Sequence, residues 1–278
     1  MSAARPPQTG RRVDLHAHTH FSDGLLSPAA LVELALERGL VALAVTDHDA
    51  VDGIVPARAA AGDRLQVLAG IEISSTLEGL DLHMLGYFVD ETSPALNEKL
   101  ASFREERRAR AVAILERLAQ LGAAVDPEEV FTAAGPGVVG RPHVAQALVR
   151  AGHVPSMDVA FQRYLGPRGD AYVPRPVFRS EDAIAVIREA GGAAVLAHPG
   201  SLSRLLVERL ANAGMAGVEV WHPQHGVIAQ RRWTEVARDL SLVPSGGSDF
   251  HGPQRGAQLG DMAVPEVTIQ LLRERAGR

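Results

Sequence analysis

Residues 13–24, VDLHAHTHFSDG, decide the fold and the chemistry expected of this chain. Apolar and polar residues alternate through the first half of the stretch, a period of two that predicts a short strand leaving a core. Side chains two residues apart on a strand share a face, so His16 and His18 point the same way. Asp23 follows in a Ser-Asp-Gly turn. This grouping indicates a metal site, although exposed strand-end histidines would show the same His-x-His pattern, so further ligands must come from elsewhere.

The composition restricts the class of protein. With 278 residues, the chain is long enough for one α/β barrel or two smaller domains. It contains no cysteine, which excludes disulfides, thiolate ligands and a cysteine nucleophile and favours a cytoplasmic location. Residues 1–12 are expected to form a disordered tail, and no run of apolar residues predicts a membrane span. The net charge of −5 gives no general attraction for nucleic acid, and with Lys99 as the only lysine a phosphate-loop lysine is absent.

Strand and helix patterns alternate along most of the chain. Strands are expected at residues 13–18, 41–49, 65–74, 80–89, 193–199, 217–223 and 242–251, and helices at 27–39, 54–61, 180–190, 202–213, 227–240 and 265–275. Between residues 93 and 173 the patterns are helical only. We therefore expect an α/β fold, either a parallel barrel or an open parallel sheet, formed by residues 13–92 and 174–278, with residues 93–173 as a helical insertion over the mouth.

Polar residues able to bind metal ions follow successive strands of this predicted fold. They are His16 and His18, Asp47, His48 and Asp49, Glu72, His83, His198, His222, and Asp249 and His251. In parallel α/β folds, functional groups gather at the carboxyl ends of the strands. Scattered core or surface histidines would show no such preference. Imidazole and carboxylate without thiolate suit zinc, manganese or iron.

The motifs resemble those of the PHP family, named for polymerase and histidinol phosphatase. The matching segments are HAH with SDG, VTDHD, GIEIS, DLHMLGY, AHPG and GSDFH, in the order of the family and over almost the whole chain. The resemblance implies a distorted (β/α)7 barrel with three divalent metal ions. The first ion would take His16, His18, Glu72 and Asp249; the second Glu72, His83 and His198; the third Asp23, His48 and His251.

The resemblance also implies a phosphoesterase. Manganese is the expected metal, with zinc or iron as alternatives, and a bridging hydroxide held by Glu72, Asp249 and His198 would attack phosphorus. We expect Asp47 and Asp49 to orient His48 rather than to bind an ion.

The insertion bears on the substrate. RPHVAQALV and FQRYLGPRGDAYVP resemble a branch that includes nucleoside 3',5'-bisphosphate phosphatases and enzymes that trim short RNA from its 5' end. That branch implies a second phosphate bound by Arg107, Arg110 and Arg141, with His143 nearby. The chain departs from the branch at Ser201 and in residues 166–170, where basic residues are common in relatives.

We therefore predict hydrolysis of nucleoside 3',5'-bisphosphate to nucleoside 5'-monophosphate and phosphate, with 5'-end exonuclease action on short single-stranded RNA as an additional activity. The alternatives are a phosphatase for another small monoester, such as histidinol phosphate, and a non-catalytic module stabilised by metal. No membrane partner is expected, and a monomer is favoured.

Overall fold

The computed structural model describes residues 11–135, 137–254 and 256–278. Residues 1–10 of the expected tail lie outside this part of the chain. Arg12, which the tail was expected to include, is the first residue of strand β1. Its guanidinium donates hydrogen bonds to the carbonyl oxygens of Arg38 and Gly260, which tie the strand to two later segments.

The fold is α/β, with one seven-stranded sheet whose strands are hydrogen-bonded in chain order. The strands are β1 (Arg12–Asp14), β2 (Leu40–Val45), β3 (Gln66–Leu77), β4 (Leu80–Tyr87), β5 (Ala193–Leu196), β6 (Gly217–Trp221) and β7 (Val243–Gly246). All neighbouring pairs are parallel except β3 with β4 and β4 with β5. Strand β4 is antiparallel because only a tight turn, with Glu78 and Gly79 at positive φ, joins it to β3.

Helices connect most of the parallel strands, as the alternating patterns predicted. They are α1 (Pro28–Glu37), α2 (Ile54–Ala61), α3 (Pro94–Gln120), α4 (Pro127–Ala134), α5 (Arg141–Arg150), α6 (Met157–Ala160), the π-helical turn η1 (Phe161–Leu165), α7 (Ser180–Glu189), α8 (Arg204–Asn212), α9 (Val227–Asp239) and α10 (Val267–Arg275). Helix α1 begins as expected, since the Ser27 hydroxyl accepts a hydrogen bond from the Ala30 N–H. None of the helices in the described residues is long and apolar enough to cross a membrane.

The sheet is open in its strand pairing, so a closed barrel is not confirmed. The ladders run from β1 to β7, and the two edge strands share no ladder in the described residues. Beyond their ends, however, the segments that follow these strands approach each other. The His18 N–H donates to the Phe250 carbonyl oxygen at 2.9 Å, and Ala17 and Phe250 form an isolated parallel bridge.

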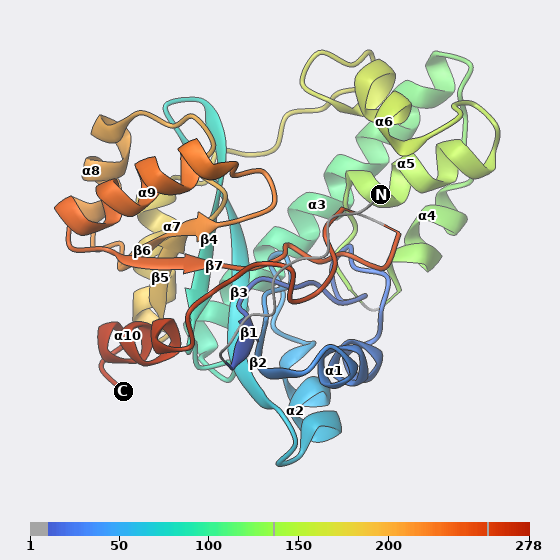
Figure 1. Cartoon of the computed structure of the whole chain (residues 1–278). Coiled ribbons are helices and arrows are strands. Elements are labelled where there is room, and N and C mark those ends of the chain that lie inside the picture. The colour runs from blue at the N-terminus through green and yellow to red at the C-terminus, as the bar shows by residue number, and fades with distance from the viewer. Residues whose placement is uncertain (1–10, 136, 255) are drawn as a thin grey trace.

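The buried apolar residues form three clusters, one of them among the helices between β4 and β5. Two clusters contain alternate residues of the strands and so lie on opposite faces of the sheet. The third joins α4, α5, α6 and η1 to the second half of α3. Figure 1 shows α4, α5 and α6 as a lobe apart from the sheet, with α3 leading into it.

Helix α3 is shared between the sheet and this lobe. Leu96, Leu100 and Phe103 in its first half pack in the main cluster, whereas Ala111 and Ile114 pack in the cluster of the lobe. The cluster of the lobe therefore includes only the second half of α3, because the first turns of this helix bury their apolar side chains in the main cluster.

Candidate metal centre and substrate cavity

The predicted ligands converge, most of them just beyond the ends of strands. His16 and His18 follow β1, His48 follows β2, His198 follows β5, and Asp249 and His251 follow β7. Glu72 and His83 do not follow this rule, because they lie inside β3 and β4. The β3–β4 hairpin stays paired past the point where the parallel strands end, so its middle residues reach the same level.

The first predicted set meets at one point. The Nε2 atom of His16 lies 3.3 Å from Glu72 Oε2 and 3.3 Å from Asp249 Oδ1, and His18 Nε2 lies 3.3 Å and 3.2 Å from the same two oxygens. Among the described residues, both Nε2 atoms and Glu72 Oε2 are buried without a hydrogen-bond partner. Buried polar atoms left without partners are costly. These three atoms, with Asp249 Oδ1 beside them, form a group that could hold a metal ion.

The spacing of these atoms suits a small divalent ion. Ligand bonds of about 2.0 to 2.1 Å in tetrahedral geometry put neighbouring ligand atoms about 3.3 Å apart. The four distances of 3.2 to 3.3 Å match this value. Three side chains of the set, His16, His18 and Glu72, are fully buried and so are shielded from bulk solvent.

The second predicted set shares the other oxygen of Glu72. His83 Nδ1 lies 2.9 Å and His198 Nε2 lies 3.1 Å from Glu72 Oε1. His48 Nδ1 lies 3.0 Å from the other oxygen, Glu72 Oε2, so His48 contacts the same carboxylate although it was expected only in the third set. The buried carboxylate of Glu72 thus stands between the first two sets, in the position that the resemblance implied for a bridging ligand.

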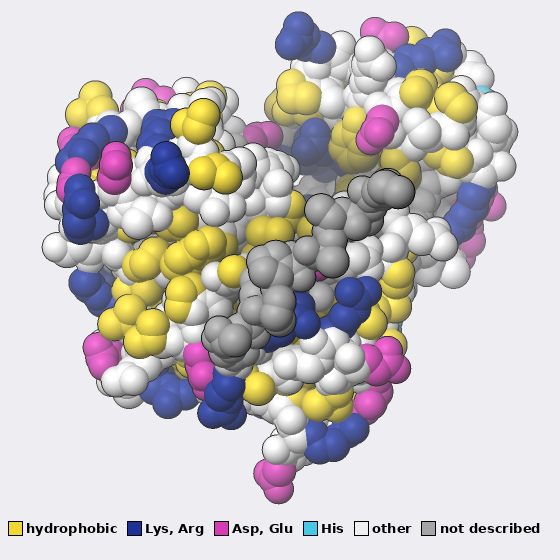
Figure 2. Space-filling view, in the orientation of Figure 1, with side chains coloured by type: hydrophobic (Ala, Val, Ile, Leu, Met, Phe, Trp, Pro, Cys, Tyr) yellow, Lys and Arg dark blue, Asp and Glu magenta, His cyan; other side chains and the backbone are white. Residues whose placement is uncertain are grey.

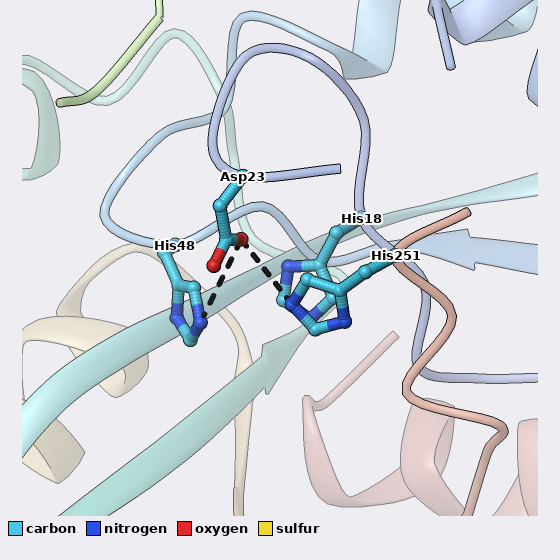
Figure 3. A group of neighbouring side chains, drawn as sticks. All are labelled: His18, Asp23, His48 and His251. Atoms are coloured by element: carbon cyan, nitrogen blue, oxygen red, sulfur yellow. Dashed lines mark ion pairs between the residues drawn. The ribbon is translucent and has the colours of Figure 1, made fainter. Parts of the chain in front are cut away.

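The third predicted set surrounds Asp23. Its Oδ1 lies 3.2 Å from His251 Nε2 and 4.0 Å from His48 Nε2. Figure 3 shows these three side chains with His18, whose ring stacks on that of His251 at 4.1 Å between centroids. One ligand atom from each of the four residues lies within 4.8 Å of the others. His18 was expected only in the first set, and the structure places it beside this one too.

The buried carboxylates and imidazoles of the centre shift one another's pKa values. Burial raises the pKa of Glu72, but His48 and the neighbouring imidazoles outweigh burial and hold the pKa well below its ordinary value. The pKa of Asp249 is lowered in the same way. Burial and the nearby His251 lower the pKa of His18 to about 3, which keeps its ring neutral. Burial also lowers the pKa of His16, but Glu219 and the other nearby carboxylates outweigh burial and hold it well above its ordinary value. Metal ions bind ionised carboxylates and neutral imidazoles, so an ion would displace the proton of His16.

Two residues of the centre have unusual backbone conformations. His198 has a φ of 24° and Asp249 a φ of 52°, in the region that disfavours side chains. Such strain persists only where surrounding contacts impose it, and it is typical of functional sites.

Glu219 and His222 stand behind the ligands. The Glu219 carboxylate, wholly buried on β6, lies 3.1 Å from His16 Nδ1 and accepts a hydrogen bond from the His198 N–H at 2.7 Å. His222 Nε2 lies 3.4 Å from Asp249 Oδ2. The sequence motifs do not include Glu219. A charged residue inside the otherwise apolar strand GVEVW was the available signal, because carboxylates are rarely buried without a partner.

Asp47 and Asp49 do not orient His48 as expected. Asp47 accepts hydrogen bonds from the Thr19 N–H at 2.7 Å and from the Ser22 hydroxyl at 2.7 Å, so it fixes the loop that carries Asp23. Asp49 instead accepts from Arg107 Nε at 2.8 Å and from the Ser74 N–H at 2.9 Å. Among the described residues, neither carboxylate forms a hydrogen bond to the His48 ring, and their bonds go instead to neighbouring loops, to β3 and to helix α3.

A cavity of about 320 Å³ opens from the centre toward the insertion. Its wall includes Asp23, His48, His83 and His198 from the centre, Arg107, Arg110, Arg141 and Arg175, and Phe103, Phe161 and Phe178. Figure 2 shows the surface indented between the lobe of α4 to α6 and the layer of α8 and α9. Metal ligands and arginines thus share one space.

The arginines of this cavity differ in their partners. Arg107 is paired with Asp49, and Arg175 with Asp81 at 3.1 Å. Arg110 donates to the Val173 carbonyl oxygen at 2.7 Å and Arg141 to that of Leu165 at 3.2 Å, and within the described residues neither guanidinium forms an ion pair.

The pKa values of Arg110 and Arg141 also reflect burial of a positive charge without an anionic partner in the described part of the chain. Burial, followed by the positive charge of Arg141, lowers the pKa of Arg110 to about 10. Burial also lowers the pKa of Arg141. These two side chains are the ones that a bound anion would stabilise.

His143 is placed differently from the arginines. Its Nδ1 accepts a hydrogen bond from the Gly140 N–H at 3.0 Å, at the first turn of α5, and the side chain is buried. Its neighbours Arg141, Pro142 and Val144 line the cavity, and His143 does not. It stabilises the start of the helix that carries Arg141.

An α/β fold with buried imidazoles and carboxylates gathered around shared points defines a metal-dependent enzyme site. Residues 14–124 match the model of the PHP domain. The chain is 39% identical over 259 residues to the 5'-3' exoribonuclease Rnm of Escherichia coli, covering 89% of this chain and 87% of that protein. It is 36% identical over 261 residues to the 3',5'-nucleoside bisphosphate phosphatase of Chromobacterium violaceum, covering 88% and 89%.

The chain belongs to the PHP family. A solved structure from Bifidobacterium adolescentis, whose name proposes a metal-dependent phosphoesterase, superimposes with a TM-score of 0.90 at 31% identity, over 99% of this chain and 100% of that one. The resemblance drawn from the motifs is therefore confirmed, and so is the prediction of a phosphoesterase.

Proposed function

We propose that this chain removes the 3'-phosphate from nucleoside 3',5'-bisphosphates and also trims short RNA from its 5' end. The observation that carries the proposal is the shared cavity, which has metal-ligand side chains at one part of its wall and two unneutralised arginines at another. A substrate with two phosphates would engage both parts. A substrate with one phosphate would leave the arginines without an anion.

We propose that three divalent ions, manganese first and zinc or iron as alternatives, are held by the three predicted sets of ligands. Such ions polarise phosphate oxygens and lower the pKa of a coordinated water. The chain itself supplies ionised carboxylates and a fixed arrangement of imidazoles. Glu72 directs one oxygen toward each of the first two sets and so fixes the position of one set relative to the other. Asp249 and His198 complete the site for the attacking water.

Arg110 and Arg141 are proposed to bind the second phosphate. Each guanidinium has donors to spare after its single bond to a carbonyl oxygen. Arginine pairs with phosphate through two parallel hydrogen bonds, which fixes orientation as well as charge. Arg107 has a different role in this proposal. Its ion pair with Asp49 and its bond to Ser74 Oγ at 2.9 Å fasten helix α3 to the strands beside the centre.

The apolar wall suits a nucleoside between the two phosphates. Phe103 and Phe178 pack edge to face at 4.8 Å, and Phe161 lines the same cavity. Aromatic side chains stack on nucleobases without regard to sequence. Histidinol phosphate, the alternative substrate, has one phosphate and would not use the arginine pair.

The test compares phosphate release from adenosine 3',5'-bisphosphate, histidinol phosphate, an aryl phosphate and a short 5'-phosphorylated RNA, with added manganese. We expect the bisphosphate to be preferred, and we expect Arg141→Ala to abolish this preference while turnover of the aryl phosphate is retained. Arg117→Ala, a change to an exposed arginine in the second half of α3, is the control. Equal turnover of all four substrates by the unaltered protein would contradict the proposal, and absence of turnover would favour the non-catalytic alternative.

We also propose that the sheet acts as a distorted barrel, supported by the hydrogen bonds between the segments that follow β1 and β7. The division into residues 13–92 and 174–278 with an insertion at 93–173 stays a proposal, as do the monomeric state and the cytoplasmic location.

A further inference from the structure

The buried carboxylate of Glu219 touches two candidate metal sets at once. One oxygen lies 3.1 Å from Nδ1 of His16, a member of the first set, and the other accepts from the backbone N–H of His198, a member of the second, at 2.7 Å. The side chain is 0% exposed, so water does not supply alternative partners. Both partners of the carboxylate are therefore ligand residues.

We propose that Glu219 is a positioning residue that sets the tautomer of His16 and the backbone of His198, and thereby couples two metal sites. The inference rests on the proposed metal centre. An ionised carboxylate only accepts hydrogen bonds, so a metal-bound His16 ring, which has a single proton, would carry it on Nδ1. The Nε2 lone pair would then be available to an ion held between Nε2, Glu72 Oε2 and Asp249 Oδ1, the two oxygens each lying 3.3 Å from Nε2. Carboxylates commonly fix metal-binding histidines in this way.

The second contact supports a strained ligand. His198 has a φ of 24°, and its N–H donates to Glu219 Oε2. Without this acceptor, the N–H would be left without a partner in a buried region, and the unfavourable conformation would have one contact fewer to maintain it. Glu219 therefore holds the ring of one ligand and the main chain of another, although 21 residues separate it from His198 and 203 from His16.

The substitution Glu219→Gln tests this role sharply. The amide has nearly the same shape but only one acceptor, whereas its two partners are both donors. If the amide oxygen faces the His198 N–H, the NH₂ group faces His16 Nδ1 and forces the ring proton onto Nε2, where it blocks metal binding. In the opposite orientation, two donors oppose each other at His198.

The measurement uses zinc as the probe. Zinc stoichiometry and affinity are determined by elemental analysis and calorimetry for the unaltered protein, Glu219→Gln and Glu219→Asp. We expect Glu219→Gln to lose one or more zinc ions and about 10- to 100-fold in affinity. Glu219→Asp keeps a carboxylate and should lose less. A role in packing alone predicts the reverse order, because glutamine preserves the shape better, and that order would overturn the proposal.

The control is Tyr87→Phe. It removes the two buried hydrogen bonds of the Tyr87 hydroxyl, to the Leu15 carbonyl oxygen at 2.9 Å and with the Ser245 hydroxyl at 3.4 Å, neither of which involves a ligand side chain. We expect it to lower the thermal unfolding midpoint without changing zinc stoichiometry.

A measurement on the unaltered protein decides the matter if the Glu219 variants do not fold. Long-range ¹H–¹⁵N spectra of the zinc-loaded protein should show His16 with a slowly exchanging proton on Nδ1, identified by its loss in His16→Asn. A His16 ring protonated on Nε2 would overturn the inference. If the unaltered protein takes up no zinc, the proposed metal centre fails instead, so the two failures are distinguishable.

Discussion

Arg110→Met is expected to remove the preference for a bisphosphate without destabilising the protein. Burial and the charge of Arg141 lower the pKa of Arg110 to about 10, which corresponds to at most about 3.5 kcal/mol of unfavourable charge. Because the side chain is only partly buried, solvent screening reduces this cost to about 1 kcal/mol. Loss of the hydrogen bond to Val173 costs about 1 kcal/mol, so the two changes nearly cancel.

The effect on activity follows from the lost charge. A hydrogen bond between a guanidinium and a phosphate contributes about 1.5 to 3 kcal/mol, which corresponds to about 10- to 150-fold in kcat/KM for the bisphosphate. Turnover of an aryl phosphate should be unchanged, since its one phosphate is placed at the metal ligands. The thermal unfolding midpoint should stay within about 3 °C.

The assay is phosphate release at saturating manganese, with circular dichroism melting of the same samples. Arg104→Met is the matched control, because Arg104 lies on the same helix and pairs with Asp52 at the surface. A parallel fall in both substrates, or the same loss in the control, would refute the assignment of Arg110 to the second phosphate.

Asp49→Asn should lower the free energy of unfolding, measured by urea titration, by about 3 kcal/mol, because Arg107 loses its buried partner. The control Asp52→Asn, which breaks an exposed pair with Arg104, should lower it by under about 1 kcal/mol. Equal effects of the two substitutions would contradict this prediction. Removal of metal by a chelator should lower the thermal unfolding midpoint by about 5 °C or more, because each ion at 100-fold excess over its Kd adds about 2.7 kcal/mol to the stability. Addition of manganese should restore the midpoint. Identical melting curves with and without chelator would count against a metal centre. In the metal-free protein, burial lowers the pKa of His251, but Asp23 outweighs burial and raises it from the ordinary 6.5 to about 10. The His251–Asp23 pair therefore stabilises the folded protein fully below pH 6.5, and this stabilisation disappears as the pH rises through about 10. The difference in unfolding free energy between the metal-free protein and His251→Gln should shrink over that range, and a difference that grows would show the sign to be wrong.

The order of strands and helices could be predicted because it depends on local patterns. The apolar run of β2 and the capped start of α1 are properties of a few neighbouring residues. The ligand residues could be grouped because parallel strands bring their ends to one edge. Glu72 and His83 escaped this rule, since the length of a hairpin depends on pairing between two strands rather than on either alone.

The partners of buried carboxylates could not be predicted. Asp49 precedes Arg107 by 58 residues and Glu219 follows His16 by 203, and no periodicity links such positions. The arginines of α3 could be recognised as one charged group, but their roles differ through contacts made outside the helix. Arg107 meets a carboxylate, whereas Arg110 meets a carbonyl oxygen.

The lobe of α4 to α6 carries apolar side chains that pack among themselves and with the second half of α3. The candidate metal ligands all lie outside residues 111–173, so the packing of the lobe does not depend directly on them. Such a unit can be exchanged while the residues of the candidate metal centre are kept. The same property makes the lobe a suitable target for engineering, where chimeras joined within α3 would redirect specificity toward other phosphorylated compounds.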